Sequence, residues 1–249
     1  MNDSGVAAPS VGFQSHLNSY YDLVGSDINF AFQTIIDAAE HEVTGFEALV
    51  RGIRKEPAPL VISRIPHDQR FAFDQACRIR AIEAASDFDI DADLHLNCTD
   101  IKANNVDLVV EVIQYIARRH RIEFDRIVLE LNNLDAIGGR EQLQAVQTAI
   151  HNAGFQTLAD NFGRRNGDLL PIALFKPQLL KLDHHLVDNI HNNPESQAIA
   201  RGVLALCQDL NIIVIAGGVE KAEEFRWLQD AGVELFQGYF FAQPGMDDS

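Results

Sequence analysis

The stretch INFAFQTIIDAAEHEVTGFEALVR, residues 28–51, contains two runs rich in apolar and β-branched residues, Ile28–Ile36 and Val43–Val50. Runs of this length and composition are typical of strands. Only Asp37–Glu42 lies between them, which is too short for the helical crossover that joins parallel strands. The stretch therefore predicts an antiparallel hairpin near the start of the chain.

Six more strand-like runs follow the hairpin, and stretches with apolar residues at helical spacing lie between them. Val109, Ile113 and Ile116 show this spacing, as do Leu143 and Val146. Strands that alternate with helices in this way predict an α/β fold, a modified (β/α)8 TIM-like barrel with one antiparallel strand. An open doubly wound sheet is the alternative. The six runs are Leu94–Cys98, Arg126–Leu131, Gln156–Ala159, Leu179–Leu182, Ile212–Ala216 and Leu235–Phe241.

The size and charge of the chain limit the classes of function. A chain of 249 residues that is 47% hydrophobic can form one barrel domain. We expect that domain over residues 25–249, with residues 1–24 as an N-terminal tail or short leading helix. The net charge of −16 disfavours direct binding to nucleic acid or to anionic membranes. A small anionic ligand would need a positive pocket or a bound metal ion.

The cysteines and the N-terminus indicate the compartment. Cys77, Cys98 and Cys207 are scattered and lack the spacing of a metal or redox motif, so they are expected to be buried thiols in a reducing compartment. Met1–Pro9 lacks the features of a signal peptide, and no apolar stretch approaches the roughly 20 residues that span a bilayer. We expect a soluble, cytoplasmic protein.

Polar residues lie near the carboxyl ends of the predicted strands. In a barrel these ends converge on one mouth, where ligands and metals bind. A single such residue is more often a loop anchor than a ligand, but repeated carboxylates and amides indicate a site for a hard divalent cation. A lysine there adds a donor for phosphate. The residues are Glu47, Asn97, Glu130, Asp160, Asn161, Lys181, Gly217 and Gln237.

An ordered set of motifs between about Phe30 and Pro244 resembles the EAL family of cyclic di-GMP phosphodiesterases. Glu47-Ala48-Leu49-Val50-Arg51 contains the Glu-Ala-Leu signature with its usual Arg, and Gln237-Gly238-Tyr239 matches as it stands. The remaining motifs are similar to family segments. They are Phe32–Ile36, Leu96-Asn97, Leu129-Glu130-Leu131, Asp160-Asn161-Phe162-Gly163, Lys181-Leu182-Asp183 and Ala216-Gly217-Gly218-Val219-Glu220.

The resemblance implies a ligand, a cofactor and roles for particular residues. Active family members hold two divalent cations, Mg²⁺ or Mn²⁺, that activate a water to cleave cyclic di-GMP to linear pGpG. Lys181 and Gln237 correspond to residues near the attacking water. The residues implied for the first metal ion are Glu47, Asn97, Glu130 and Asp160, and those implied for cyclic di-GMP are Gln33, Glu47, Leu49, Arg51 and Asp183.

Several positions depart from the family pattern. Asn161 replaces the second Asp of Asp-Asp-Phe-Gly, and Gly217 replaces the Glu that is a metal ligand or general base in the family. Asn132-Asn133 stands for Thr-Glu, and Arg164-Arg165-Asn166-Gly167 stands for Thr-Gly-Tyr-Ser. Loss of a general base alone can cost roughly 10²–10⁴ in rate. We therefore expect at most one tightly bound cation, little or no hydrolysis, and vestigial roles for Lys181 and Gln237.

Three classes of function follow from the resemblance. The chain is a cyclic di-GMP receptor, a regulatory module that binds another protein, or an active or slow metal-dependent phosphodiesterase that produces pGpG. Gln33, Glu47 and Arg51 favour the receptor, whereas the altered loop and the acidic surface favour the protein-binding module. A protein partner is expected in either regulatory case, and a homodimer is a further expectation.

Overall fold

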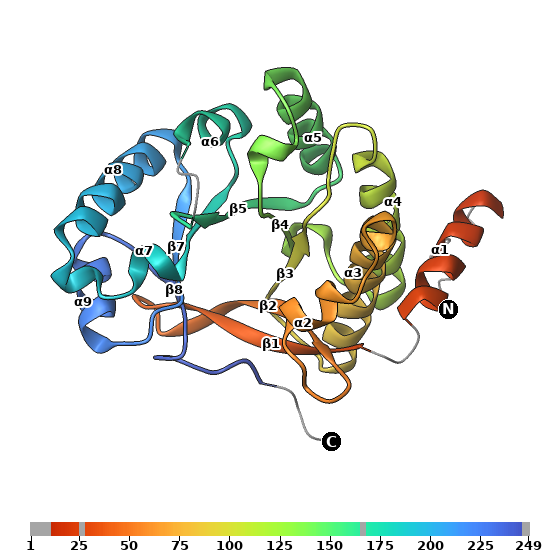
Figure 1. Cartoon of the computed structure of the whole chain (residues 1–249), viewed down its shortest axis with the longest axis horizontal. Coiled ribbons are helices and arrows are strands. Elements are labelled where there is room, and N and C mark those ends of the chain that lie inside the picture. The colour runs from red at the N-terminus through yellow and green to blue at the C-terminus, as the bar shows by residue number, and fades with distance from the viewer. Residues whose placement is uncertain (1–10, 25–27, 165–167, 246–249) are drawn as a thin grey trace.

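Eight strands close into a barrel in the order of the chain, as the computed structural model of residues 11–24, 28–164 and 168–245 shows (Figure 1). β1 is antiparallel to both of its neighbours, and the other neighbouring strands are parallel. The predicted α/β barrel with one antiparallel strand is confirmed, and the open sheet is excluded. The strands are β1 (Ile28–Asp37), β2 (Glu42–Gly52), β3 (Asp93–Cys98), β4 (Ile127–Leu131), β5 (Gln156–Phe162), β6 (Leu179–Leu182), β7 (Ile213–Gly217) and β8 (Leu235–Gln237).

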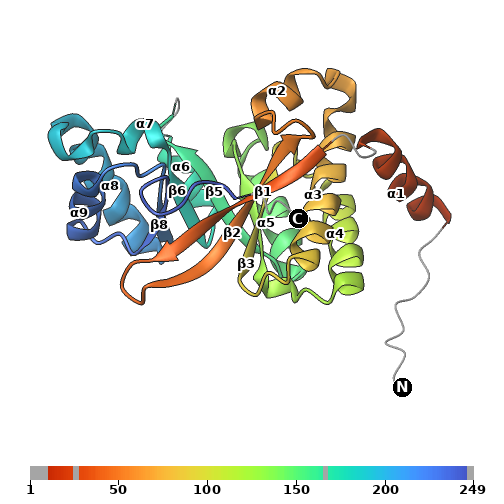
Figure 2. The ribbon, with the colours of Figure 1, turned by 90° about the horizontal axis from the view of Figure 1, so that it is seen from below.

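The predicted hairpin forms the first two strands. β1 and β2 pair along their whole lengths, with a bulge between Ile35 and Ile36. On its other edge β1 meets β8 through only two pairs, Ile36–Phe236 and Asp37–Leu235. Farther along that edge, Phe32 and Gly245 exchange two backbone hydrogen bonds of 3.0 and 3.1 Å. The C-terminal segment therefore helps to cover the free edge of β1, as Figure 2 also shows.

Helices cover the outside of the parallel strands (Figure 1). Their apolar faces pack on the sheet, as Val109, Ile113 and Ile116 of α4 do. α1 lies outside this ring and packs on α3, with Leu17 and Tyr20 buried. The helices are α1 (Val11–Val24), α2 (Ala58–Ser63), α3 (Arg70–Asp87), α4 (Val106–His120), α5 (Arg140–Asn152), α6 (Leu169–Phe175), α7 (His184–Val187), α8 (Pro194–Leu210) and α9 (Ala222–Asp230).

The predicted last strand, Leu235–Phe241, was too long, because β8 ends at Gln237. A Cβ atom at Gly238 would lie only 2.1 Å from the Val219 carbonyl oxygen, so the backbones meet closely and the chain turns away from the sheet. The apolar residues that follow form an aromatic cluster instead, with the rings of Phe240 and Phe241 5.7 and 5.5 Å from the ring of Phe225.

Two further sequence predictions concern membrane spans and cysteines. The described residues contain no helix that is long and apolar enough to cross a membrane. The three cysteines are free thiols, with Cys98 and Cys207 buried and Cys77 partly buried. The prediction of buried thiols therefore holds for two of the three.

Side chains that point into the barrel form two layers. The lower layer is an apolar cluster of Ile35, Val128, Leu158, Leu179 and Ile215, with Leu235 packed against it. On the parallel strands, the residue two positions later lies on the same face and closer to the carboxyl mouth. Those positions supply four members of the polar upper layer, Glu130, Asp160, Lys181 and Gln237. Glu47 of β2 contacts Lys181, Asn97 of β3 contacts Glu47, and these two residues complete the layer. Gly217 lies at the same level without a side chain.

Candidate functional site

The upper layer of the barrel brings six of the predicted site residues together. Lys181 on β6 lies at the centre, and its Nζ donates to Glu47 Oε2 at 3.0 Å and to Glu130 Oε1 at 2.7 Å. Asp160 Oδ1 lies 4.0 Å from the same nitrogen. The amides of Asn97 and Gln237 donate to the two oxygens of Glu47, at 3.1 and 2.8 Å. The proposed metal ligands and the two proposed catalytic residues thus form one cluster.

The cluster holds three carboxylates against one ammonium. Burial opposes ionisation of Glu47, but Lys181 and the amide donors outweigh it and lower the pKa of Glu47 to about 2. Burial and the nearby charge of Glu47 raise the pKa of Glu130 to about 8. Burial, with repulsion from Glu130 and Glu47, raises the pKa of Asp160 to about 7 despite Lys181. When fully ionised, the three carboxylates and Lys181 carry a net charge of −2, so the cluster has an excess of negative charge.

The carboxylate and amide oxygens of the cluster are the type of ligand that a hard divalent cation prefers. Among the described residues, no group of three or more His, Cys, Asp or Glu side chains is arranged to hold a metal ion. Glu130 Oε2, however, is buried without a hydrogen-bond partner. A buried carboxylate oxygen without a partner is costly, and a divalent cation would satisfy it. The residues therefore supply suitable oxygen ligands for a cation, although the carboxylates surround Lys181 in this structure.

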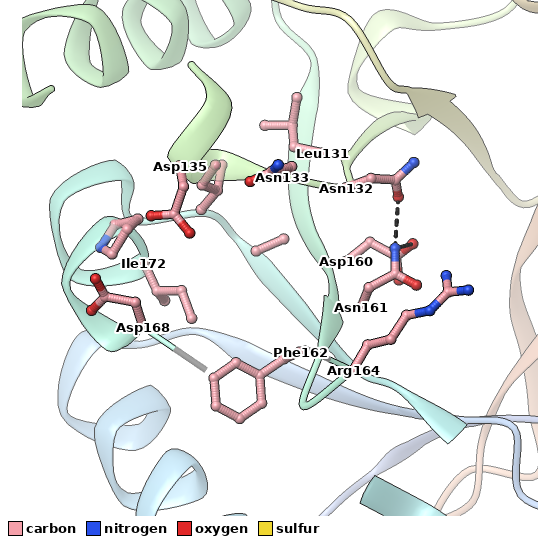
Figure 3. Close-up of a pocket in the computed structure, with 13 residues that line it drawn as sticks. Leu131, Asn132, Asn133, Asp135, Asp160, Asn161, Phe162, Arg164, Asp168 and Ile172 are labelled. Atoms are coloured by element: carbon pink, nitrogen blue, oxygen red, sulfur yellow. Dashed lines mark hydrogen bonds between the residues drawn. The ribbon is translucent and has the colours of Figure 1, made fainter. Parts of the chain in front are cut away.

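Asn161 and Asn132 extend the site beyond Asp160. Asn161 Nδ2 donates to Asp160 Oδ2 at 2.7 Å and to Asn132 Oδ1 at 3.0 Å, and Asn132 donates in turn to Asn97 Oδ1 at 3.3 Å. This amide chain lies on one side of a pocket of about 550 Å³, with Asp135 and Asp168 on the other side (Figure 3). At Asn161 the structure therefore has a hydrogen-bond donor facing Asp160.

Gly217 at the end of β7 leaves no empty space for a side chain. A Cβ atom at this position would lie 2.8 Å from the Leu182 carbonyl oxygen and 3.2 Å from Lys181 Cγ. Backbone and the stem of Lys181 occupy the region that a larger residue would need. A side chain at position 217 would require the neighbouring strand to shift.

A second pocket of about 680 Å³ opens from the cluster towards α2 and α3. Glu47, Asn97 and Asp160 line it on the barrel side, and Ile62 and Arg70 line it on the helical side. The pocket has room for a ligand much larger than a metal ion.

The residues implied for cyclic di-GMP do not all line this pocket. Leu49 does. Gln33 lies beside Glu47 in the β1–β2 ladder, and Arg51 Nη1 donates to the Val50 carbonyl oxygen at 3.0 Å. The Asp183 carboxylate caps α7 and accepts from His185 N at 2.8 Å and Nδ1 at 2.5 Å. Gln33, Arg51 and Asp183 lie outside the lining.

Two buried residues that the motifs did not identify contact the cluster. His95 on β3 places Nδ1 2.9 Å from Glu130 Oε1, and burial together with the charge of Lys181 lowers the pKa of His95 to about 3. Arg78 on α3 donates to Asp74 at 2.5 Å and to the Asn97 carbonyl oxygen at 3.1 Å. His95 precedes Asn97 by two residues, so strand alternation could have identified it. Helical Arg78 has no comparable signal.

The last departures from the family pattern lie beside the site. Asn133 Oδ1 accepts from Ala136 N at 3.3 Å and so caps a short helical turn. Arg164 lines both pockets. Residues 165–167 of the altered loop lie outside the described residues.

Comparisons with solved structures agree with the fold. A standalone versatile EAL protein from Vibrio cholerae O395, in its c-di-GMP-bound form, is 36% identical with a TM-score of 0.83, over 89% of this chain and 94% of that chain. BlrP1 of Klebsiella pneumoniae, in a calcium and cyclic di-GMP complex, is 29% identical with a TM-score of 0.81, over 89% of this chain and 57% of that chain.

Curated relatives include both enzymes and a regulator. Cyclic di-GMP phosphodiesterase PdeR of Escherichia coli K12 is 32% identical over 136 residues, which are 55% of this chain and 21% of that protein. The blue light- and temperature-regulated antirepressor BluF of the same strain is 26% identical over 216 residues, 86% of this chain and 54% of that protein. The matched region therefore covers about half of BluF and a smaller part of PdeR. The family model of the EAL domain matches residues 21–244, and the chain belongs to the EAL domain family.

Proposed function

We propose that this chain binds cyclic di-GMP at the carboxyl mouth of the barrel and acts as a receptor or regulatory module, with little or no hydrolysis. The observation that carries the proposal concerns the two positions, 161 and 217, where family members have ligands for a second cation. There Asn161 donates a hydrogen bond to Asp160, and Gly217 has neither a side chain nor the space for one. Two carboxylates that family members use for a second cation are therefore missing.

A single divalent cation, Mg²⁺ or Mn²⁺, is part of the proposal. Glu47, Asn97, Glu130 and Asp160 would hold it, and its charge would balance the −2 of the ionised cluster. When bound, such an ion polarises a phosphoryl oxygen and lowers the pKa of a coordinated water. Lys181 and Gln237 both donate to Glu47 and hold that carboxylate in place.

The dinucleotide would occupy the pocket of about 680 Å³ beside the cluster. Leu49 and Val50 line it. Arg51, the next residue, is the proposed phosphate-binding residue, because the planar guanidinium group suits a phosphate. Gln33 and Asp183 complete the proposed ligand set. The binding unit is the barrel of residues 25–249, with residues 1–24 as a leading segment.

A protein partner would recognise the form of the chain that has cyclic di-GMP bound. The similarity to an antirepressor over 86% of this chain supports such a regulatory role, and a homodimer is a second form that the partner could take. A cytoplasmic location is also part of the proposal, because three free thiols suit a reducing compartment.

The alternative is an active or slow phosphodiesterase that produces pGpG. It is favoured by the complete first ligand set and by the similarity to PdeR. If one cation suffices to activate a water, the chain would turn over cyclic di-GMP slowly.

Calorimetric titration with cyclic di-GMP, in EDTA and then with Mg²⁺ or Ca²⁺, tests the proposal, and chromatography of the same samples measures pGpG. We expect binding without appreciable pGpG. Arg51→Ala should weaken binding at least tenfold, because a charged hydrogen bond to phosphate is lost. Arg54→Ala, at an exposed arginine three residues later, is the matched control. Rapid turnover would establish the enzyme instead, and absence of binding would leave the protein-binding module.

A further inference from the structure

His95 is a polar side chain at an apolar level of the barrel. It lies opposite Val128 in the β3–β4 ladder, and Val128 belongs to the apolar lower layer. His95 is only 2% exposed, and burying a polar ring is unfavourable unless it forms hydrogen bonds. The position of His95 therefore needs an explanation beyond packing.

His95 forms a hydrogen bond with the carboxylate of a proposed metal ligand. Glu130 Oε1 accepts from Lys181 Nζ at 2.7 Å, and His95 Nδ1 lies 2.9 Å from the same oxygen. A carboxylate that ligates a metal ion is ionised, and in that form it can only accept a hydrogen bond, so Nδ1 donates its proton to Oε1. Two donors thus hold Oε1, whereas Oε2 of the same carboxylate is buried without a partner.

The neighbouring strand makes room for the ring. Gly45 on β2 faces it, and a Cβ atom there would lie 3.0 Å from His95 Nε2 and 3.1 Å from the Asp93 carbonyl oxygen. These separations are shorter than ordinary van der Waals contacts. Glycine at position 45 therefore leaves space for the imidazole ring, whose Nδ1 lies beside Glu130.

We propose that His95 is a positioning residue that fixes the Glu130 carboxylate so that Oε2 remains available to a divalent cation. The inference rests on the one-cation site of the proposed function. Hydrogen-bond partners of ligating carboxylates orient them for the metal, and their loss typically weakens metal binding about 10–100-fold. His95 is not one of the proposed ligands of the cation or the dinucleotide, and it acts through Glu130.

Calorimetric titration of the full chain with Mn²⁺ tests this role. His95→Leu removes the donor and extends the apolar layer, and we expect it to weaken Mn²⁺ binding about 10–100-fold. His95→Asn keeps a donor near the position of Nδ1, and we expect its affinity to lie within about threefold of the unmodified protein. A structural role alone would not distinguish the two variants in this way.

Two controls keep the result interpretable. His95→Val is measured beside His95→Leu, because a smaller apolar residue avoids overpacking, and thermal unfolding confirms that each variant is folded. The inference is overturned if a folded apolar variant binds Mn²⁺ as tightly as the unmodified protein, or if His95→Asn loses as much affinity as the apolar variants. If the unmodified protein binds no Mn²⁺, the one-cation site fails and the inference fails with it; cyclic di-GMP binding in EDTA would still test the receptor separately.

Discussion

On strands β4 to β6, the two layers inside the barrel come from the same strands and are separated by a step of two residues. The lower layer, Ile35, Val128, Leu158, Leu179 and Ile215, is apolar, so its burial favours folding. The upper layer gathers Glu47, Glu130 and Asp160 around Lys181, so its burial removes charges from water at a cost that their pairing only partly offsets. Two positions on the same strand can therefore have opposite effects: the lower one stabilises the fold, and the upper one builds the site at a cost in stability.

The largest effect should come from breaking the upper layer. Lys181→Met keeps the aliphatic stem but removes the ammonium that contacts Glu47 and Glu130. Buried carboxylates that lose their counter-ion are strongly destabilising, so the free energy of unfolding in urea should fall by about 3–5 kcal/mol. Lys102→Met, which breaks an exposed ion pair with Asp100, should cost no more than about 1 kcal/mol. Equal losses in the two variants would contradict the distinction between the layers.

Truncation in the lower layer should affect stability alone. Leu158 is completely buried, and Leu158→Ala should lower the free energy of unfolding by about 3 kcal/mol through lost burial and a cavity. The affinity for cyclic di-GMP and for Mn²⁺ should stay within about twofold of the unmodified protein at a temperature where the variant is folded. A large loss of affinity would show that the two layers are mechanically coupled.

A smaller effect is expected at Gly217. Gly217→Ala places a methyl group against the Leu182 carbonyl oxygen and the stem of Lys181, and such overpacking should cost about 1–3 kcal/mol in urea unfolding. Gly202→Ala in α8 is the matched control, because nothing lies within 4 Å of its Cβ and alanine favours a helix by about 1 kcal/mol. If Gly217→Ala is instead neutral, β6 and β7 can separate at little cost. Gly217→Glu would then be a reasonable route to hydrolysis.

The sequence predicted the fold because apolar runs and the short Asp37–Glu42 connection restrict the possible topologies. The starts and ends of strands were less certain. β5 continues to Phe162, beyond the predicted end at Ala159, because the ladder with β6 shifts register there and resumes at Phe162. The aromatic residues after Gln237 resemble a strand by composition, and only the close approach of Val219 to Gly238 shows that the strand ends.

The sequence predicted which residues belong to the cluster, because strand ends and motifs identify them. The central position of Lys181 was not predictable, because it depends on distances across the barrel. His95 could have been found from its alternation with Asn97, but a histidine between two leucines is an ordinary strand residue. The crowding at Gly217 depends on a carbonyl oxygen of the neighbouring strand, and no pattern along one strand reveals it.

The closure of the barrel has a consequence for its synthesis. Ile36 pairs with Phe236, 200 positions later in the chain, and at about 5–20 residues per second the ribosome needs roughly 10–40 s to cover that interval. The β1–β2 hairpin can form early, but until β8 and Gly245 arrive the outer edge of β1 has no partner of its own. Unpaired strand edges readily join other chains. The nascent protein should therefore be most prone to aggregation just before β8 and the segment around Gly245 have been synthesised.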